Sequence, residues 1–434
     1  MSLLTSMSSG TTGMAAASAE LSVVSDNIAN SNTVGFKSGR AAFEDALAQS
    51  VVGGLGQIGL GSRLQAVQRL LSQGALSNTG VNSDLALQGQ GFFVVHGTAS
   101  DGRPGTFYTR AGQFTVDRDG YLVNLDGLRV QGYPADATGA LQPLVGDLLV
   151  GTASSQPQAT GTVTVRGNLA SDAPLAAAWD PADPAGTSNF STSVTVYDSL
   201  GKATAVQVYF SHITNGPPAG STWDWHAMVD GADVGGTAGA PTQIADGVLT
   251  FNSSGALDTE TTNSSSASFS GATANQVITF DFGDSITTDT GTGLSGTTQF
   301  AGPSSVTHIN QDGYAAGMLT DMQVSDDGTI VGQFSNGQRR AVARVAIAEF
   351  ASAEGLQRAG DQLFSENAAS GPPLLGGAGT GGRGSISGGT LEGSNVDLGN
   401  ELVTLIAYQR AYQANARTVT TSDEMLQELA NLKR

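Results

Sequence analysis

The 434-residue chain has no cysteine, and only three of its 19 basic residues are lysines, set against 38 acidic residues for a net charge of −19. The absence of cysteine excludes disulfide bonds, thiol chemistry and thiolate-bound metals. A chain this acidic repels nucleic acid and anionic membrane surfaces, so we expect no nucleic-acid partner. Long hydrophobic runs are also missing. No segment approaches the ~20 apolar residues of a membrane span, and we expect no membrane insertion.

The first nineteen residues carry no charge, and the small residues 15–19 (AAASA) resemble a signal-peptidase site. However, no basic residue precedes them, and Ser, Thr and Gly interrupt the stretch where a signal peptide needs a continuous apolar core. The composition therefore disfavours a cleaved signal peptide.

Residues 1–33 repeat apolar side chains at alternating steps of four and three, the heptad pattern of a coiled-coil-like helix. The opposite face is rich in Ser, Thr, Ala and Gly and almost uncharged, which suits a helix that also contacts protein on that side. Asn27, Asn30 and Asn32 are expected to end the helix, because asparagine tolerates the left-handed conformation and bonds to nearby backbone. The residues predicted to mediate assembly from this helix are Leu3, Met7, Met14, Leu21, Val24 and Ile28.

Residues 394–434 mirror this pattern at the other end of the chain. Ser394 stands three residues before Asp397, the spacing of a capping box at a helix start. The predicted helix has about 35 to 38 residues and is roughly 55 Å long. Its predicted apolar seam, with two polar interruptions, is Leu398, Leu402, Leu405, Gln409, Tyr412, Ala416, Val419, Asp423, Leu426 and Leu429.

Between these helices the sequence predicts β structure, with many turns supplied by 59 glycines. Residues 193–210 and 248–259 each have the pattern of a strand, a turn and a strand, and residues 222–231 alternate apolar and polar side chains. The segments 116–123 (VDRDGYLV) and 324–331 (VSDDGTIV) share one Asp-Gly hairpin pattern. Two such hairpins on either side of the long β stretch suggest one discontinuous domain with an insertion; chance similarity of Asp-Gly turns is the alternative.

The predicted fold class is α+β, predominantly β, with long N- and C-terminal helices that form a coiled-coil-like pair and nested discontinuous β domains between them. Glycine-rich stretches just inside both helices are interpreted as joints. The predicted organisation is an assembly helix (1–33), a joint with a Gly-rich loop (34–75), a discontinuous β core (76–145 and 313–364), an inserted outer β domain (146–312), a Gly-rich return joint (365–393) and a second assembly helix (394–434).

No pattern supports catalysis. Matches to the Gly-x-Gly-x-x-Gly fingerprint occur at 54–59, 291–296 and 377–382, but none lies in a strand–turn–helix unit. The DRDG sequence at 117–120 resembles the start of a calcium loop, yet Tyr121 occupies a ligand position. We therefore expect no catalytic residue, no metal, no cofactor and no enzyme activity.

Two motifs at opposite ends of the chain resemble signatures of the bacterial flagellar rod and hook axial protein family. The first is DNIANSNTVGFK (26–37), which supplies Asn27, Ile28, Ala29, Asn30, Asn32, Thr33, Gly35, Phe36 and Lys37. The second spans 394–432, and the residues predicted to mediate assembly from this C-terminal helix are Asn395, Val396, Asp397, Leu398, Leu402, Leu405, Gln409, Arg410, Tyr412, Gln413, Asn415, Leu426 and Leu429. Within the family, the large insertion favours the hook branch over the distal rod branch, which typically lacks it. A β-rich adhesin or binding module is a further alternative, but it has no use for two heptad helices at the termini.

The resemblance implies a structural subunit that polymerises into a flexible helical tube, a universal joint that transmits torque from rod to filament. It implies that the chain's main partner is itself, in a helical homopolymer. Further implied partners are the distal rod protein, the hook cap protein during assembly, the hook–filament junction protein and the flagellar type III export apparatus. The implied location is extracellular, in the hook at the cell surface.

Overall fold

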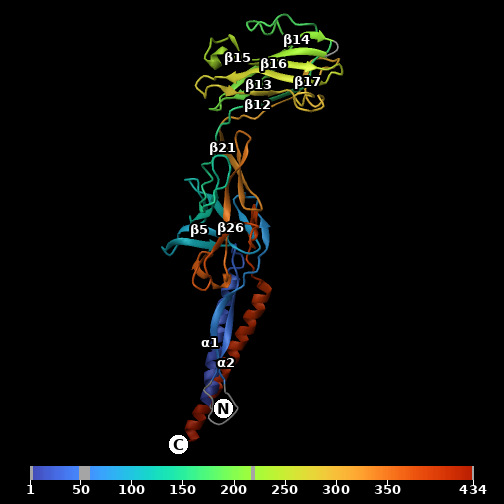
Figure 1. Cartoon of the computed structure of the whole chain (residues 1–434). Helices are drawn as coiled ribbons and strands as arrows, with labels where there is room; N and C mark the ends of the chain where they lie inside the picture. Colours follow the sequence, from blue (N-terminus) through green and yellow to red (C-terminus); the bar gives the residue numbers. More distant parts are fainter. Residues whose placement is uncertain (1–2, 48–58, 217–219, 433–434) are drawn as a thin grey trace. The chain divides into compact units, whose positions relative to one another are not determined.

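The computed structural model describes residues 3–47, 59–216 and 220–432. The chain divides into two compact units. The first, which we name the helix-bearing unit, comprises Met1–Ala153, Leu319–Gln333 and Arg339–Arg434. The second, the inserted unit, comprises Ser154–Met318 and Phe334–Gln338. The chain is mostly β, with two long helices at its ends and several sheets between them, which confirms the coarse fold class (Figure 1).

The two helices are α1 (Leu3–Ala29) and α2 (Leu398–Leu432). Within the described residues, neither is long and apolar enough to cross a membrane. The 35 residues of α2 agree with the predicted length, but its cap differs from the prediction. Asp397, rather than Ser394, caps the helix, because its Oδ1 accepts the amides of Gly399 (2.9 Å) and Asn400 (3.3 Å).

A long antiparallel hairpin follows α1. Its strands are β1 (Gly39–Leu47) and β2 (Gly59–Arg69), and both contact α1. A side chain at Gly39 would meet Val23 of α1 at 3.4 Å, and one at Gly61 would meet Thr12, so glycine lets the hairpin approach the helix closely. Much of the predicted Gly-rich loop of the first joint (48–58) lies outside the described residues.

The helix-bearing unit is built around a large sheet with the strand order β21-β22-β23-β9-β5-β6-β25-β24. Aromatic side chains fill one of its cores: Phe92 packs edge-on against Phe350 and Phe364 at ring distances of 6.1 and 5.6 Å. The strands on and beside this path are β5 (Phe92–Thr98), β6 (Pro104–Thr109), β7 (Phe114–Val116), β8 (Leu122–Asn124), β9 (Arg129–Pro134), β10 (Gly146–Asp147), β21 (Gly317–Val324), β22 (Thr329–Phe334), β23 (Arg339–Glu349), β24 (Gln357–Gly360), β25 (Leu363–Ser365) and β26 (Leu374–Gly377), with the short 3-10 helix η2 at Ala353–Gly355.

Two small sheets tie the returning chain to the start of the core. Strand β27 (Ser385–Gly388) pairs with β4 (Leu85–Gln88), and β28 (Thr390–Glu392) pairs with β3 (Leu76–Asn78), both antiparallel. The stretch interpreted as a return joint therefore contains three paired strands, counting β26. This pairing brings Glu392 beside residues that follow α1.

The inserted unit is a β-sandwich. Its six-stranded sheet has the order β13-β14-β15-β16-β17-β18, and a three-stranded sheet has the order β19-β12-β20. Both sheets contribute to one core, in which Trp223 and Trp225 are completely buried with Val163 and Phe280. The strands are β11 (Ser154–Ser155), β12 (Thr162–Asn168), β13 (Phe190–Tyr197), β14 (Ala203–Gly216), β15 (Gly220–Asp230), β16 (Pro241–Phe251), β17 (Leu257–Ala267), β18 (Gln276–Val277), β19 (Thr279–Asp281) and β20 (Ser305–Gln311), with the 3-10 helix η1 at Gly231–Val234.

The predicted hairpins are confirmed: residues 193–210 and 248–259 form the β13–β14 and β16–β17 hairpins. Residues 222–230 lie on β15, but the alternation of buried side chains holds only as far as Trp225, since residues 225–229 are all buried. Each of the two Asp-Gly patterns, 116–123 and 324–331, joins antiparallel strands: β7 to β8 and β21 to β22.

Candidate functional site: the terminal helices and the polar junction at their base

Helices α1 and α2 run side by side in the helix-bearing unit (Figure 1). They approach closely where α1 has glycine: a Cβ at Gly10 would lie 2.9 Å from Val419 Cγ2, and one at Gly13 would lie 2.6 Å from Asn415 Nδ2. Small residues let two helices come together, so a larger side chain at these positions requires the side chains of Val419 and Asn415, or the helices themselves, to shift.

Of the predicted seam of α2, Leu405, Ala416, Val419 and Leu426 are among the less exposed positions of the helix. Leu402 and Tyr412, predicted to pack against α1, are 51% and 42% exposed. The less exposed positions recur at steps of three and four and are largely small or polar, so a search for apolar periodicity detects only some of them. These less exposed positions are Glu401, Thr404, Leu405, Tyr408, Ala411, Asn415, Ala416, Val419, Ser422 and Leu426.

The other predicted assembly residues fall on both sides of this seam. On α1, Val24 is buried, whereas Met7, Met14, Leu21 and Ile28 are partly exposed. On α2, Gln409, Arg410 and Gln413 are exposed. The side chains of Leu3 and Leu429 lie outside what the structure describes.

An exposed apolar face remains on α2 after the helices have packed together. Val403 is 69% exposed and Ile406 is 49% exposed, and they lie with Leu398, Leu402 and Tyr412 in the first half of the helix. A contiguous apolar surface of this kind on one helix marks a protein–protein contact, because leaving it in water is unfavourable.

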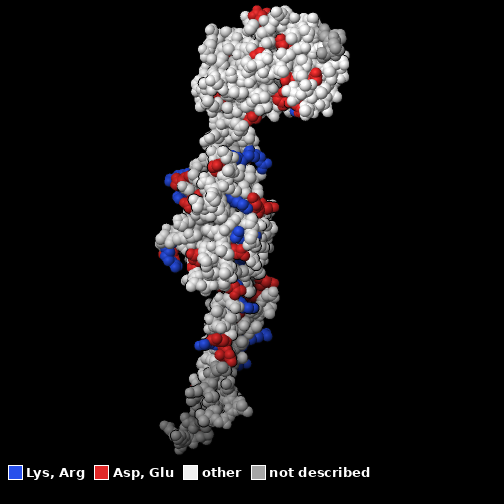
Figure 2. All heavy atoms as spheres, viewed as in Figure 1, with Lys and Arg blue, Asp and Glu red and all other residues white. Residues whose placement is uncertain are grey.

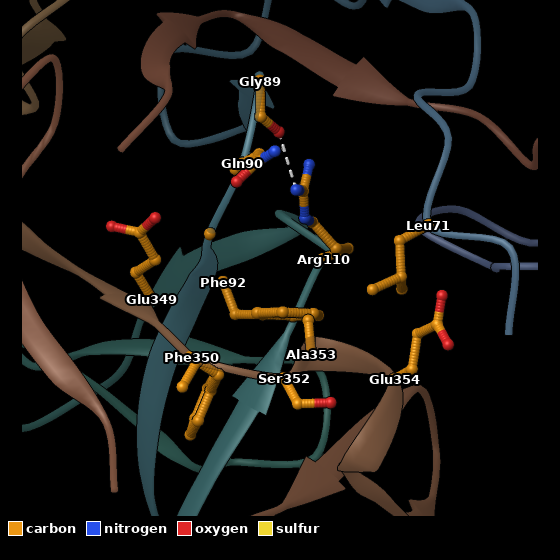
Figure 3. Close-up of a pocket in the computed structure, with 12 residues that line it drawn as sticks. Leu71, Gly89, Gln90, Phe92, Arg110, Glu349, Phe350, Ser352, Ala353 and Glu354 are labelled. Carbon is orange, nitrogen blue, oxygen red and sulfur yellow. Dashed lines mark hydrogen bonds between the residues drawn. The ribbon is translucent and has the colours of Figure 1, made fainter. Parts of the chain in front are cut away.

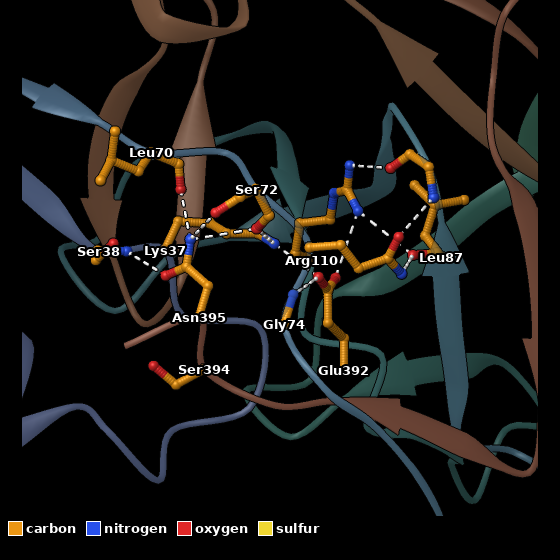
Figure 4. Close-up of polar contacts among 12 residues, drawn as sticks. Lys37, Ser38, Leu70, Ser72, Gly74, Leu87, Arg110, Glu392, Ser394 and Asn395 are labelled. Atoms are coloured by element: carbon orange, nitrogen blue, oxygen red, sulfur yellow. Dashed lines mark hydrogen bonds and ion pairs between the residues drawn. The ribbon is translucent and has the colours of Figure 1, made fainter. Parts of the chain in front are cut away.

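A buried ion-pair cluster lies where the N-terminal motif meets the returning chain (Figure 4). The Lys37 ammonium donates to Glu392 Oε1 at 2.6 Å and to the Ser72 carbonyl at 2.8 Å. Arg110 reaches Glu392 Oε2 at 3.4 Å and donates to the Gly89 carbonyl at 2.7 Å. Glu392 also accepts the Gly74 amide at 2.9 Å. One carboxylate thus holds two cations and three separate chain segments.

The charges in this cluster are shielded from water. The side chains of Lys37 and Glu392 are fully buried, and that of Arg110 is 4% exposed. Burial lowers the pKa of the Lys37 ammonium, and the Glu392 carboxylate opposes that shift. Burial likewise lowers the pKa of Arg110, again opposed by Glu392. The carboxylate therefore offsets part of the cost of burying two cations.

Two motif asparagines connect the helices to the hairpin. Asn395 accepts the Ser38 amide at 2.7 Å and donates to the Leu70 carbonyl at 2.7 Å. Asn27 exchanges two 2.8 Å hydrogen bonds with the backbone of Gly39 and donates to Glu401 of α2 at 3.0 Å. The prediction that Asn27 ends the helix is therefore wrong: it lies inside α1, and its buried amide joins α1, β1 and α2.

The end of α1 is formed by the residues that follow. Asn30 folds back on Asp26, to which its backbone and side-chain amides both donate, and Thr33 donates to the Asn30 side chain at 3.1 Å. Phe36 is then buried under Arg358, whose guanidinium lies 5.7 Å from the ring centroid. The motif residues thus end α1 and fix the turn that follows it.

Gly35 allows that turn, and replacing it with alanine is expected to destabilise the helix-bearing unit by about 2–4 kcal/mol. Its φ is +69°, and a Cβ would lie 2.5 Å from the Ala111 amide nitrogen. Gly80→Ala is a matched control, because Gly80 has φ +71° with nothing within 4 Å of a Cβ. Chemical denaturation of both variants separates the clash from the backbone strain; equal losses would contradict the close approach at Gly35.

A carboxyl group is buried between the helices and β1. Glu20 of α1 is 6% exposed, and its Oε2 has no hydrogen-bond partner among the described residues. Burial raises the pKa of Glu20, the Ala41 amide opposes the shift, and Glu401 adds to it. Burial also raises the pKa of Glu401. The charge of Glu401 on α2 therefore adds to the cost of ionising Glu20 on α1.

We expect Glu20→Gln to stabilise the unit by about 1 kcal/mol at pH 7 and to have little effect at pH 4. Because the pKa of Glu20 is raised above its ordinary 4.5, the folded state binds more protons than the unfolded state. The stability of the wild type therefore decreases as the pH rises from 4 to 7. Glutamine carries no charge, so the variant lacks this contribution to the pH dependence. Chemical denaturation at pH 4 and pH 7 measures the difference in unfolding free energy between the variant and the wild type. An equal difference at both pH values would show that the charge of Glu20 is not the cause.

A pocket of about 400 Å³ is lined by Phe92, Phe350 and Arg110, with Arg110 drawn above the Phe92 ring (Figure 3). Glu349 and Glu354 lie at the two ends of one continuous segment of its lining. Among the residues that line it, Ser352 is the one hydroxyl, there is no histidine or lysine, and no hydrogen bond joins Ser352 Oγ to either carboxylate. The lining does not pair a nucleophile with a base, and within the described residues no group of three His, Asp or Glu could hold a metal ion.

Sequence reasoning missed Glu392 and Arg110. They are 282 positions apart, and only the β28–β3 pairing brings them together. One signal was available: Lys37 is one of only three lysines and lies within the N-terminal motif, and a lysine that is buried there requires a carboxylate partner.

Comparison with known proteins places these features in a family. Models of flagellar proteins match the chain in order: the flagella basal body rod protein model at 7–37, the flagellar hook protein FlgE/F/G D1 domain at 86–167, the flagellar basal body protein FlaE D2 domain at 168–314 and the flagellar basal body rod FlgEFG protein C-terminal model at 387–432. These matches define the class of protein, an axial component of the bacterial flagellum.

The relatives identify the branch. The chain is 35% identical over 437 residues to the flagellar hook protein FlgE of Salmonella typhimurium, covering 99% of this chain and 100% of the relative. It is 36% identical over 434 residues to the flagellar hook protein FlgE of Escherichia coli, covering 98% and 99%. The solved flagellar hook protein FlgE2 of Helicobacter pylori aligns with 71% of this chain and 98% of its own, with 17% identity and a TM-score of 0.48. The chain belongs to the flagellar hook protein FlgE family.

Proposed function

We propose that this hook subunit polymerises through α1 and α2 into a flexible helical tube that transmits torque from rod to filament. The structural role itself follows from the family, and neither the distal rod nor the adhesin alternative is favoured, since hook proteins match the chain along its whole length. The tube and its flexibility are the proposal.

The observation that supports it is the exposed apolar face of α2, with Val403 69% exposed in the lone chain. Burying one such side chain contributes about 1.5–3 kcal/mol. Because a neighbour has to supply the missing contacts, each added subunit becomes more stable in the polymer than alone, and assembly is cooperative.

The inserted unit supports the flexible part of the proposal. It carries fourteen acidic residues against two basic ones, Arg166 and Lys202. Acidic side chains are scattered over an otherwise uncharged surface on the face visible in Figure 2. Neighbouring copies of such a unit repel one another weakly, so their contacts can slide as a tube bends, whereas large apolar contacts would lock them.

The proposed partners besides the chain itself are other axial components: the distal rod protein, the hook cap protein during assembly and the hook–filament junction protein. The flagellar type III export apparatus would deliver the subunit to the cell surface, where the hook lies outside the cell. The coiled-coil-like pairing of α1 with α2 is part of the same proposal, supported by the close approach at Gly10 and Gly13.

The experiment is deletion of the gene from the source bacterium, followed by complementation. Cells without it are expected to lose motility and to show rods without hooks by electron microscopy, and the wild-type gene is expected to restore both. Normal hooks in the deletion strain would contradict the proposed function.

A further inference from the structure

One face of the β1–β2 hairpin packs on α1. A Cβ at Gly39 would lie 3.4 Å from Val23 of α1 and 3.3 Å from Val67 of β2, so the side chains on this face point toward the helix. Side chains alternate along a strand, and the register sets Val67 and Leu64 opposite residues of β1 that share the face of Gly39. Both side chains therefore lie on the face that packs on α1.

Helix α1 leaves part of this face uncovered. Ala41 of β1 is 8% exposed, whereas Leu64 and Val67 of β2 are 44% and 43% exposed. The opposite face is polar and carries the ion pair between Glu44 and Arg63. Because an antiparallel sheet with one polar face buries its apolar face, the exposure of Leu64 and Val67 indicates a contact that the lone chain does not make.

A charge extends this face along β1. Asp45 continues the alternation of β1, is exposed and has no described hydrogen-bond or ion-pair partner. We name Leu64, Val67 and Asp45 the hairpin flank. The flank is thus apolar where the hairpin begins and acidic further along the strand.

The exposed side of α2 has the complementary pattern. Val403, Ile406 and Arg410 follow one another at steps of three and four, so they form one stripe of the helix, which we name the α2 stripe. Val403 is 69% exposed and Ile406 is 49% exposed. Arg410 is also exposed, and it has no ion-pair partner among the described residues. The stripe is apolar first and basic further along.

The hairpin and α2 run along α1 in the same direction. The hairpin begins beside Val23 and reaches Thr12. Helix α2 is bonded to Asn27 near its start and comes close to Gly10 further along. Both elements therefore run from the C-terminal end of α1 toward its N-terminal end, and in both the apolar residues come before the charge.

The spacings of the two patterns also match. Along β1, Asp45 lies four residues beyond Ala41, the partner of Val67, which is about 13 Å in a strand. Along α2, Arg410 lies seven residues beyond Val403, which is about 10 Å in a helix. The flexible arginine side chain spans the difference.

We propose that the α2 stripe of one copy docks on the hairpin flank of a second, parallel copy, with their apolar side chains in contact and Arg410 paired with Asp45. The contact rests on the proposed function and deepens it by naming the surface that covers α2. It joins two different surfaces, so every copy offers one to each neighbour and the contact continues through a polymer of one polarity. Opposite charges at the same end of both surfaces favour this parallel arrangement.

Cross-linking tests the contact in the full-length chain. Val67→Cys and Val403→Cys together place one thiol on each surface of a chain that has no natural cysteine. In the polymer, a short bis-maleimide is expected to join successive copies into a ladder of dimers, trimers and longer species, because every chain carries both halves. Either single-cysteine chain is expected to give no cross-link.

The other outcomes of this experiment would overturn the proposal. A polymer of the double-cysteine chain without cross-links would show that the surfaces do not meet. Dimers from the Val403→Cys chain alone would place α2 against α2, and a cross-link within the monomer would place the chain's own α2 on its hairpin. A wild-type chain that does not polymerise at all would contradict the proposed function instead.

Charge reversal tests the ion pair separately. Arg410→Glu and Asp45→Arg are each expected to raise the critical concentration for polymerisation about three- to tenfold, and combining them is expected to reverse most of that rise. The matched controls Arg118→Glu and Asp172→Arg change exposed charges outside both surfaces and are expected to polymerise like the wild type. Helix content by circular dichroism should be unchanged in every variant. A combined variant as impaired as the single ones, or single variants that polymerise normally, would overturn the pairing.

Discussion

Replacing Glu392 with glutamine is expected to lower the free energy of unfolding of the helix-bearing unit by about 3–5 kcal/mol, because it leaves two buried cations without a compensating charge. Lys37 and Arg110 both pair with this carboxylate in surroundings closed to water. The same side chain also accepts the Gly74 amide, so its loss releases a third chain segment. Because the cluster joins the N-terminal motif to the returning chain, its loss should destabilise both terminal regions.

The two units allow an internal control for this measurement. All three tryptophans, Trp179, Trp223 and Trp225, belong to the inserted unit, whereas both long helices belong to the other. During denaturation of Glu392→Gln, the far-ultraviolet circular dichroism of the helices should be lost at lower denaturant, while the tryptophan fluorescence transition keeps its midpoint. Glu354→Gln, at an exposed position, should change neither. An unchanged helix transition in Glu392→Gln would show that the cluster contributes little.

The double substitution Leu402→Asp and Ile406→Asp is expected to abolish polymerisation while the monomer stays folded. Both side chains are about half exposed in the lone chain, so aspartate there costs the monomer little. In a polymer each buried apolar side chain contributes about 1.5–3 kcal/mol, so losing two raises the critical concentration at least about a hundredfold.

The control for this variant has the same chemistry elsewhere. Leu374→Asp changes an equally exposed leucine, at 57%, on β26 of the same unit, and should leave polymerisation and motility unchanged. A Leu402→Asp, Ile406→Asp chain that assembles normal hooks would contradict the assignment of this face to assembly. Monomer unfolding in the double variant, rather than a folded monomer, would place those side chains in the fold instead.

The sequence predicted the features that depend on neighbours along the chain. The terminal helices and the β13–β14 and β16–β17 hairpins are confirmed, because periodicity and turn residues act locally. The predicted seam of α2 stays a prediction as an assembly surface: Val419, one of its members, meets Gly10 of α1, whereas Leu402 and Tyr412 are exposed in the lone chain. The role of Asn27 was wrong because its partners, Gly39 and Glu401, are set by tertiary contacts.

The buried ion-pair cluster shows most clearly what a single sequence does not predict. Lys37 was singled out as a motif residue, yet its charge partner lies 355 positions away on a three-residue strand. No local pattern marks Glu392, because the pairing of β28 with β3 is what selects it. A site assembled from three remote segments is determined by topology, so a single sequence shows its parts without showing that they meet.

The central claim, that the exposed face of α2 is covered by a second copy in the polymer, is tested most directly by thiol labelling. Since the natural chain has no cysteine, Val403→Cys and Leu200→Cys each provide one unique probe, on α2 and on the inserted unit, and both positions are about two-thirds exposed in the monomer. We expect polymerisation to slow maleimide labelling of the cysteine at position 403 by at least about tenfold, because burial blocks access to the thiol, and to leave labelling at position 200 nearly unchanged. Equal labelling at position 403 in monomer and polymer would contradict the account.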